Sequence, residues 1–424
     1  MNYISTRNQS VILSLSAAIQ DGLASDGGLY IPEHIPVIDC SIFSSELSYA
    51  EFAFRLLKNF FKTDKLFESL ATICERTFHF PVPLKKLADN TFILELFHGP
   101  TSSFKDFGAQ FLSECLNTLA NCKKTILVAT SGDTGSAVAS AFYRKLNYRV
   151  IILYPDGQVS AKQEHQITCW DENIFAFAVD GTFDQCQQLV KSAFCDPVWQ
   201  SSEGLSSANS INIGRLLPQV TYYAYNSLKF YRKNGDKPGF IIPSGNLGNA
   251  TAAFWAKAMG FPIREIVLAT NANQVIPDYL NSGNYQPRQS ITTVANAMDV
   301  GNPSNLERLD YLFDSFSSLK ENVTAFSVND EQICKKIKRV YEQYNYIICP
   351  HTATALHVRD QLDKLPWIVA ATAAPCKFDE LIEPIINIKI PVAPQLQRLL
   401  DRPNNIVKVG ASLEAIRKMI TRSL

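Results

Sequence analysis

The sequence lacks an excess of charge of either sign. Its 424 residues include 40 Lys and Arg against 40 Asp and Glu, so the formal net charge at pH 7 is zero. Proteins that bind nucleic-acid phosphates normally carry a basic excess or a stripe of Lys and Arg, and this sequence has neither. We therefore predict that nucleic acid is not a partner of this protein.

Long apolar runs are also missing. No segment approaches the roughly 20 apolar residues that a helix needs to cross a bilayer, so we predict no membrane-spanning helix. The 19 glycines and 21 prolines are too few for a collagen-like chain, and 46% hydrophobic with 19% charged residues excludes a disordered one. At roughly 100–200 residues per domain, the length predicts two or three packed units.

The cysteines and histidines form no recognisable metal-binding pattern. Ten cysteines are scattered along the chain, without a CxxC pair or the spacing of a zinc finger. Scattered cysteines are typical of reduced thiols, so we expect a cytoplasmic protein. His351 and His357 do not have the spacing of a zinc-binding helix, and no metal site is predicted.

Two kinds of hydrophobic pattern divide the chain. From Tyr49 to Arg76 apolar residues recur at helical spacing, which predicts an all-helical N-terminal stretch. After Pro81, short runs rich in branched residues alternate with longer amphipathic segments. The clearest runs are Thr125–Ala129, Val150–Tyr154, Ile174–Val179, Gly239–Pro243, Ile263–Ala269 and Trp367–Thr372. This alternation predicts an α/β fold with parallel sheets and helices on both of their faces.

Two glycine-containing loops follow predicted strands, at the edge where open α/β sheets bind their ligands. Residues 130–135 read TSGDTG, and residues 243–249 read PSGNLGN. Glycines let a ligand approach the backbone, and the free N–H groups at the start of a helix suit a phosphate or a carboxylate. Neither loop matches the lysine-containing phosphate loop or the dinucleotide fingerprint, and each alone is more typical of a tight turn.

Lys105 lies between two phenylalanines near the start of a predicted helix, in the stretch LELFHGPTSSFKDFG at residues 94–108. Most lysines in such a place extend the amine to water from a partly buried helix. Alternatively, apolar neighbours and a helix N-terminus lower the pKa of the amine and make it available for Schiff-base formation. Composition and spacing do not decide between these two interpretations.

Several motifs together point to one family. SFKDFGAQF, TSGDTG and SGNLGN occur in the order and separation seen in threonine synthases, and the chain resembles that family of fold-type-II pyridoxal-phosphate enzymes. Further matching stretches are DGGLYIP from Asp26, ELFHGPT from Glu95, ILYP from Ile152, SANSIN from Ser207, NAMDVGNPSN from Asn296 and PHTA from Pro350. One departure is Ala374, where relatives often have a histidine, so any proton transfer by that histidine must be carried out elsewhere.

The resemblance implies a fold and a reaction. It implies two parallel-sheet α/β domains, a large one at 81–110 and 209–424 and a small one at 111–208, behind an N-terminal helical segment at 1–80. The implied cofactor is pyridoxal 5'-phosphate. The implied reaction converts O-phospho-L-homoserine and water into L-threonine and phosphate, in a monomer or homodimer. A phospho-lyase or dehydratase that releases a keto acid, and a catalytically silent relative, are the alternatives.

The resemblance also implies roles for individual residues. Lys105 forms the Schiff base with the cofactor, and Thr372 places a neutral hydroxyl beside the pyridine nitrogen. The implied cofactor-binding residues are Lys105, Ser244, Gly245, Asn246, Leu247, Gly248, Asn249 and Thr372. The implied substrate-binding residues are Thr101, Ser131, Gly132, Asp133, Thr134, Asn209, Ser210 and Arg215.

The segment from Asn209 to Arg215 allows two interpretations. Capping preferences alone predict that Ser210 or Asn212 caps the following helix and that Arg215 is a solvated surface charge. By its likeness to the NSxNxxR stretch of the family, the asparagine, the serine and the arginine instead bind the phosphate of the substrate.

Overall fold

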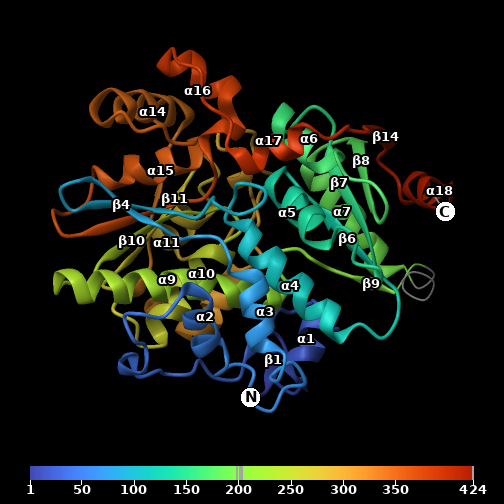
Figure 1. The fold of residues 1–424 in the computed structure, drawn as a ribbon, viewed down its shortest axis with the longest axis horizontal. Coiled ribbons are helices and arrows are strands. Elements are labelled where there is room, and N and C mark those ends of the chain that lie inside the picture. Colours follow the sequence, from blue (N-terminus) through green and yellow to red (C-terminus); the bar gives the residue numbers. More distant parts are fainter. Residues whose placement is uncertain (197–198, 200–203, 423–424) are drawn as a thin grey trace.

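The N-terminal part of the chain combines helices with a small sheet. The computed structural model describes residues 1–196, 199 and 204–422 (Figure 1). Strands β1 (Tyr3–Ser5), β2 (Ile12–Leu13) and β3 (Tyr30–Pro32) pair antiparallel, and the helices are α1 (Leu15–Asp21), η1 (Cys40–Ile42), α2 (Tyr49–Leu57) and α3 (Leu70–Thr77). The helical prediction for residues 49–76 is confirmed at α2 and α3, whereas residues 58–69 between them form turns. The three strands were not predicted, because two or three residues are too few to show a periodicity.

Six strands form the larger sheet. They are β4 (Leu84–Ala88), β5 (Thr91–Glu95), β10 (Gly239–Pro243), β11 (Ile266–Thr270), β12 (Thr324–Ser327) and β13 (Trp367–Ala371). Their order is β12-β11-β10-β13-β5-β4, and every pair is parallel except β4 with β5. Since β10, β11 and β13 are buried along their whole length, they read as continuous apolar runs in the sequence.

Helices cover both faces of this sheet, and some of them pack on other helices rather than on its strands. They are α4 (Lys105–Leu119), α9 (Ile213–Asn234), α10 (Gly248–Ala258), α11 (Val275–Ser282), η2 (Asn296–Met298), α12 (Leu306–Phe313), α13 (Phe316–Asn322), α14 (Asp330–Tyr344), α15 (Pro350–Arg359), η3 (Pro375–Phe378), α16 (Asp379–Ile386) and α17 (Pro394–Leu400). Alternate residues of β10 face opposite sides: Phe240 and Ile242 belong to the core with α9 and α10, and Ile241 to the core with α14 and α15. The predicted α/β architecture is confirmed.

Five parallel strands form the smaller sheet, in the order β14-β8-β7-β6-β9. The strands are β6 (Lys124–Ala129), β7 (Tyr148–Pro155), β8 (Ile174–Asp180), β9 (Leu205–Ser206) and β14 (Val407–Gly410), with helices α5 (Asp133–Phe142), α6 (Ala161–Thr168), α7 (Phe183–Cys195) and α18 (Leu413–Arg422). The implied large domain at 209–424 includes residues 407–410, but β14 pairs with β8 at the outer edge of the smaller sheet (Figure 1). A mostly exposed four-residue strand carries no apolar run that would reveal this pairing.

The carboxyl ends of four strands turn toward one region between the two sheets. Strands β5, β10 and β13 of the larger sheet lead into the loops before α4, before α10 and before η3, and β6 of the smaller sheet leads into the loop before α5. Ligands of α/β proteins bind at such ends. Among the described residues, no helix is long and apolar enough to cross a membrane.

Candidate active site

Lys105 is the first residue of α4 and lies at the end of β13. The backbone N–H of Phe104 donates to the carbonyl of Thr372 at 2.8 Å, and Ser103 forms an isolated bridge with Ala373, which fixes the loop that presents the lysine. Burial lowers the pKa of the Lys105 amine to about 8. The charges of Arg215 and Lys377 also lower it, whereas the charge of Asp133 raises it. About a tenth of the amine is therefore unprotonated at pH 7, far more than for an ordinary lysine, as the Schiff-base interpretation requires.

The loop at residues 130–135 makes a tight turn into α5. The hydroxyl of Thr130 accepts hydrogen bonds from the N–H groups of Gly132 at 3.0 Å and Gly135 at 2.8 Å. Gly132 has a φ of 130°, and a Cβ there would lie 2.6 Å from the side-chain amide of Gln163. Glycine is therefore required at this position, and the partly exposed Ser131 and Thr134 flank it.

Asp133 is buried at the start of α5 and pairs with Lys377 of η3. The Nζ atom of Lys377 lies 2.8 Å from Asp133 Oδ1, and the side-chain amide of Gln163 donates to the same oxygen at 3.0 Å. Burial opposes ionisation of Asp133, but the charges of Lys377 and Lys105 outweigh it and lower its pKa. This ion pair joins η3, which follows β13 of the larger sheet, to α5, which follows β6 of the smaller one, and leaves the Asp133 side chain committed to a protein partner.

Lys377 is a site residue that the sequence reasoning missed. Its side chain is 0% exposed, and Nζ also donates to the carbonyl of Thr101 at 2.9 Å. The available signal is a lysine within the otherwise apolar TAAPCKF stretch after β13, the stretch that also contains Ala374. A lysine is almost never fully buried unless it is paired, so burial here requires a partner such as Asp133.

The loop at residues 244–249 leads from β10 into α10. A Cβ at Gly245 would lie 2.8 Å from the Cα of Met298, so only glycine fits against this backbone. Leu247 has a φ of 61°, and no side chain among the described residues caps α10. The N–H groups of the first turn of α10 are therefore available to an anion.

Two asparagines of this loop hold it in place. Asn246 donates from Nδ2 to the hydroxyl of Ser210 at 2.6 Å, which joins the loop to the segment before α9. Asn249 accepts at Oδ1 from the hydroxyls of Tyr222 at 2.5 Å and Tyr223 at 3.0 Å. The Asn249 side chain is thus directed toward α9, while Gly248 and Asn249 still offer their backbone N–H groups.

The segment 209–215 combines the two interpretations given above. Asn212 caps α9, since its Oδ1 accepts from the Gly214 N–H at 2.9 Å, and this part of the capping prediction is confirmed. The prediction of a solvated Arg215 is wrong: the side chain is 3% exposed, and Nη1 donates to the Ala208 carbonyl at 2.5 Å. Burial lowers the pKa of Arg215 to about 10, against the charge of Asp106.

Arg215 is buried because it packs against the lysine helix. A Cβ at Gly108, three residues after Lys105, would lie 2.8 Å from Arg215 Nε, so the glycine makes room for the guanidinium. That Nε has no hydrogen-bond partner within the described part of the chain. A buried cation with an unused donor, next to Lys105, suits an anionic ligand.

Thr101 and Thr372 lie beside Lys105 in different settings. The backbone N–H and the hydroxyl of Thr101 both donate to Asp106, at 2.9 and 2.6 Å, so its side chain holds the loop rather than facing a ligand. Burial raises the pKa of Asp106 to about 6, against these hydrogen bonds and the charge of Lys377. Thr372 is buried directly after β13, where it meets the Lys105 loop.

Unsatisfied polar atoms gather around Lys105. Buried atoms without a partner within the described residues include Ser102 Oγ, Ser103 Oγ, Arg215 Nε, Asn296 Oδ1 and His351 Nδ1. Leaving such an atom unpaired costs about 1–3 kcal/mol, and native proteins rarely leave several together. A cofactor with phosphate, hydroxyl and ring-nitrogen groups, together with an anionic substrate, supplies partners for them. With the uncapped α10 and the amine of Lys105, the residues present fit pyridoxal phosphate.

His351 lies near Lys105, a position that its spacing in the sequence does not reveal. It is the second residue of α15, and its Nε2 accepts from the backbone N–H of Ala297 at 3.2 Å. Burial lowers its pKa to about 4, against Asp133 and together with Lys105 and Lys377. His351 is therefore a neutral polar group at the site.

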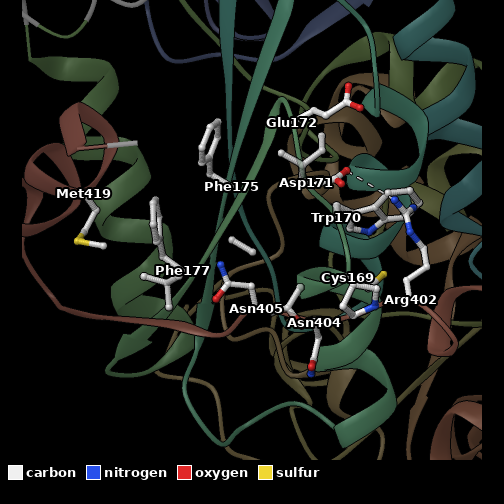
Figure 2. A pocket seen from close by; sticks show the side chains of 15 residues that line it. Cys169, Trp170, Asp171, Glu172, Phe175, Phe177, Arg402, Asn404, Asn405 and Met419 are labelled. Carbon is white, nitrogen blue, oxygen red and sulfur yellow. Dashed lines mark ion pairs between the residues drawn. The ribbon is translucent and has the colours of Figure 1, made fainter. Parts of the chain in front are cut away.

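A separate cavity of about 350 Å³ lies between the smaller sheet and the C-terminal segment (Figure 2). The guanidinium of Arg402 lies 4.5 Å from the ring centre of Trp170 and 3.7 Å from Asp171. Phe175, Phe177 and Met419 line another part of it. None of the predicted site residues lines this cavity, and its arginine is already engaged.

Comparison with known families covers nearly the whole chain. Residues 78–368 match the model described as "Pyridoxal-phosphate dependent enzyme". Residues 2–78 match "Threonine synthase N terminus", and residues 351–420 match "Threonine synthase, C-terminal".

Individual relatives agree with these matches. The threonine synthase of Haemophilus influenzae is 39% identical over 409 residues, covering 96% of this chain and 95% of that protein. The crystal structure of threonine synthase from Escherichia coli superposes with a TM-score of 0.94 at 34% identity, covering 100% of both chains. The pyridoxal-phosphate-bound threonine synthase from Brucella melitensis gives 0.92 at 30% identity, covering 100% and 99%. The chain thus belongs to the threonine synthase family of pyridoxal-phosphate-dependent enzymes.

Proposed function

We propose that the protein converts O-phospho-L-homoserine and water into L-threonine and phosphate, with Lys105 as its catalytic residue. The observation that carries this proposal is the position of the Lys105 amine between two separate anion sites. One is the uncapped first turn of α10, and the other is the buried Arg215 with its unused Nε. A phosphorylated cofactor and a phosphorylated substrate require two such sites beside one amine.

The cofactor occupies the α10 side of the site in this proposal. The backbone N–H groups of the loop at residues 244–249 would hold its phosphate, Lys105 would bind it covalently, and Thr372 would offer a neutral hydroxyl to its ring nitrogen. A neutral hydroxyl there leaves the ring less electron-withdrawing than a carboxylate would. Once bound, pyridoxal phosphate draws electrons from the substrate and so acidifies its Cα and Cβ protons.

The substrate lies between the two glycine loops. Ser131, Gly132 and Thr134 offer hydroxyls and N–H groups to its carboxylate, while Asn209, Ser210 and Arg215 hold its phosphate. Asp133 does not contact the substrate in this proposal, because its carboxylate is already paired with Lys377. Thr101 fixes the loop before Lys105 through its hydrogen bond to Asp106. These two residues of the predicted substrate set are therefore positioning residues in the proposal.

Lys105 moves the protons of the reaction. Substrate binding frees its amine, which removes the proton from Cα and then one from Cβ, so that phosphate leaves from Cγ. A proton is then delivered to Cγ, water adds at Cβ, and Lys105 returns a proton to Cα. One amine with a pKa near 8 is suited to both acceptance and donation near neutral pH. His351, with its pKa lowered to about 4, is too weak a base to compete for these protons.

Product analysis with O-phospho-L-homoserine tests this function. We expect threonine and phosphate in equal amounts, with no keto acid and no ammonia. A phospho-lyase or dehydratase shares the reactive lysine but releases a keto acid and ammonia in place of threonine. A catalytically silent relative forms none of these products, so either result contradicts the proposal.

The Arg215→Lys variant tests the substrate's phosphate site. A guanidinium binds phosphate through two parallel hydrogen bonds, which an ammonium group does not reproduce. We expect kcat/KM for phosphohomoserine to fall roughly ten- to a hundredfold, and Ser210→Ala to cause a smaller loss. The absorbance of the bound cofactor serves as the control and should stay unchanged. Parent-like kcat/KM in both variants would mean that the phosphate binds elsewhere.

A further inference from the structure

Arg308 of α12 is a buried cation that the proposed reaction does not use. Its side chain is 1% exposed, and all five of its N–H donors have acceptors. Nε and Nη2 donate to the Tyr30 carbonyl at 3.2 and 3.0 Å, and Nη2 also to the Ile211 carbonyl at 2.7 Å. Nη1 donates to the Ser210 carbonyl at 3.3 Å and to Asn305 Oδ1 at 2.7 Å. Every acceptor is a neutral oxygen, so these bonds leave the positive charge of the guanidinium uncompensated.

These bonds close a ring that contains both anion-binding loops. Asn305 donates from Nδ2 to the Asn246 carbonyl at 3.0 Å, and Asn246 donates from Nδ2 to the Ser210 hydroxyl at 2.6 Å. Arg308 closes the ring, because its Nη1 donates both to the Ser210 carbonyl and to Asn305 Oδ1. The loop after β10 and the segment before α9 are thus fixed relative to each other, and Arg308 is the residue that connects the two ends.

The ring lies against the first turn of α10. A Cβ at Gly248, the first residue of that helix, would lie 3.4 Å from Asn305 Nδ2 and 3.7 Å from Ser210 Cβ. A displacement of Asn305 or Ser210 therefore changes the packing against the first turn of α10, where the free N–H groups lie. Burial lowers the pKa of Arg308 to about 9, against the charge of Glu307, so the guanidinium stays charged at neutral pH.

We propose that Arg308 is a positioning residue for both phosphate groups, an inference that rests on the proposed function. Its guanidinium holds the carbonyls that orient Ser210 and, through Asn305, the loop at Asn246. Its positive charge, which no charged hydrogen-bond acceptor neutralises, favours phosphate dianions in the neighbouring loops. A lysine preserves the charge, but one ammonium nitrogen does not reach acceptors on three chain segments.

The Arg308→Lys variant separates this role from general support of the fold. The apoenzyme is titrated with pyridoxal 5'-phosphate and with pyridoxal, which lacks the phosphate, and the holoenzyme is titrated with inorganic phosphate by calorimetry. We expect the Kd of pyridoxal 5'-phosphate and that of inorganic phosphate each to rise about tenfold, the factor produced by losing one hydrogen bond of ordinary net strength. The Kd of pyridoxal should stay that of the parent.

Arg264→Lys is the matched control. Arg264 lies just before β11, at the opposite end of the larger sheet, with its guanidinium 4.6 Å from the ring centre of Trp367 and 3.0 Å from Asp363. It should bind all three ligands as the parent does. If Arg308→Lys discriminates between pyridoxal 5'-phosphate and pyridoxal like the parent and binds inorganic phosphate equally well, Arg308 is only structural and the inference is wrong.

Asn305→Ala provides a second variant if Arg308→Lys does not fold. It removes two bonds of the ring and keeps the cation, so the same loss of phosphate discrimination is expected, and parent-like discrimination overturns the inference. None of these titrations requires turnover. A parent enzyme that binds the ligands but does not form threonine would therefore count against the proposed function alone.

Discussion

Replacing Lys105 with alanine is expected to abolish turnover together with the visible absorbance of covalently bound cofactor. The amine is assigned the covalent link and the proton transfers at Cα and Cβ, so no step of the reaction is left without it. General acid–base catalysis by one group contributes about 10²–10⁴-fold, and with the covalent role added we expect a loss of at least about 10⁴-fold in kcat. Absorbance before and after borohydride reduction, followed by mass spectrometry of the peptides, measures the link.

The control for this prediction is a buried lysine far from the site. Lys336 of α14 donates to Asp360 at 2.7 Å, and Lys336→Ala should keep the absorbance even if it lowers stability. Reduced cofactor found on a lysine other than Lys105 would contradict the assignment. The pH dependence gives a second check. Because the amine has a pKa of about 8, its attack on free cofactor should slow about tenfold for each pH unit below 8 and level off above it.

Lys377→Met is expected to cause the largest loss of stability among substitutions at the site. Removing one partner of a buried ion pair costs about 3–5 kcal/mol, because the remaining charge is left uncompensated. The pKa of Asp133 is lowered in the folded state, so the pair stabilises the fold above the ordinary carboxyl pKa of about 3.9, and this contribution is lost as the pH falls through the folded value. At pH 7 the whole contribution is therefore present in the parent and absent from the variant.

Urea unfolding at pH 7 and pH 5 measures this effect. Without Lys377 the buried Asp133 carboxyl takes up a proton more readily, so the difference in free energy of unfolding between parent and variant should be smaller at pH 5. The double variant Lys377→Met, Asp133→Asn removes both charges and should recover much of the lost stability. A single variant that is as stable as the parent at pH 7 would show that the pair contributes nothing.

The fold was predictable from the sequence where strands are long and buried. Strands such as β10 and β13 face helices on both sides, so every residue is apolar and the run stands out. The edge strands β9 and β14 are short, and β14 is mostly exposed. Their pairing depends on backbone hydrogen bonds to a strand far away in sequence. The pattern of side chains does not identify that strand.

The candidate site was predictable in its loops but not in its buried charges. The two glycine loops and Lys105 follow strand ends or begin helices, and those positions are visible in the sequence. Arg215, Lys377 and Arg308 are buried by packing against residues distant in sequence. Arginine and lysine are exposed in most proteins, so the sequence favours exposed side chains at these positions. Only the folded chain shows the glycine or the acid that lets such a side chain be buried.

The pairing of β14 with β8 has a consequence for how this protein is made. The chain from β10 to β13, which builds most of the larger sheet, lies between these two strands in sequence. During synthesis from the N-terminus, β8 therefore emerges long before its neighbour and presents an unpaired row of N–H and C=O groups to other chains. Contacts this remote form slowly. The outer edge of β8 thus stays open to unwanted strand pairing until residues 407–410 arrive, and a chaperone that covered it would protect the nascent chain.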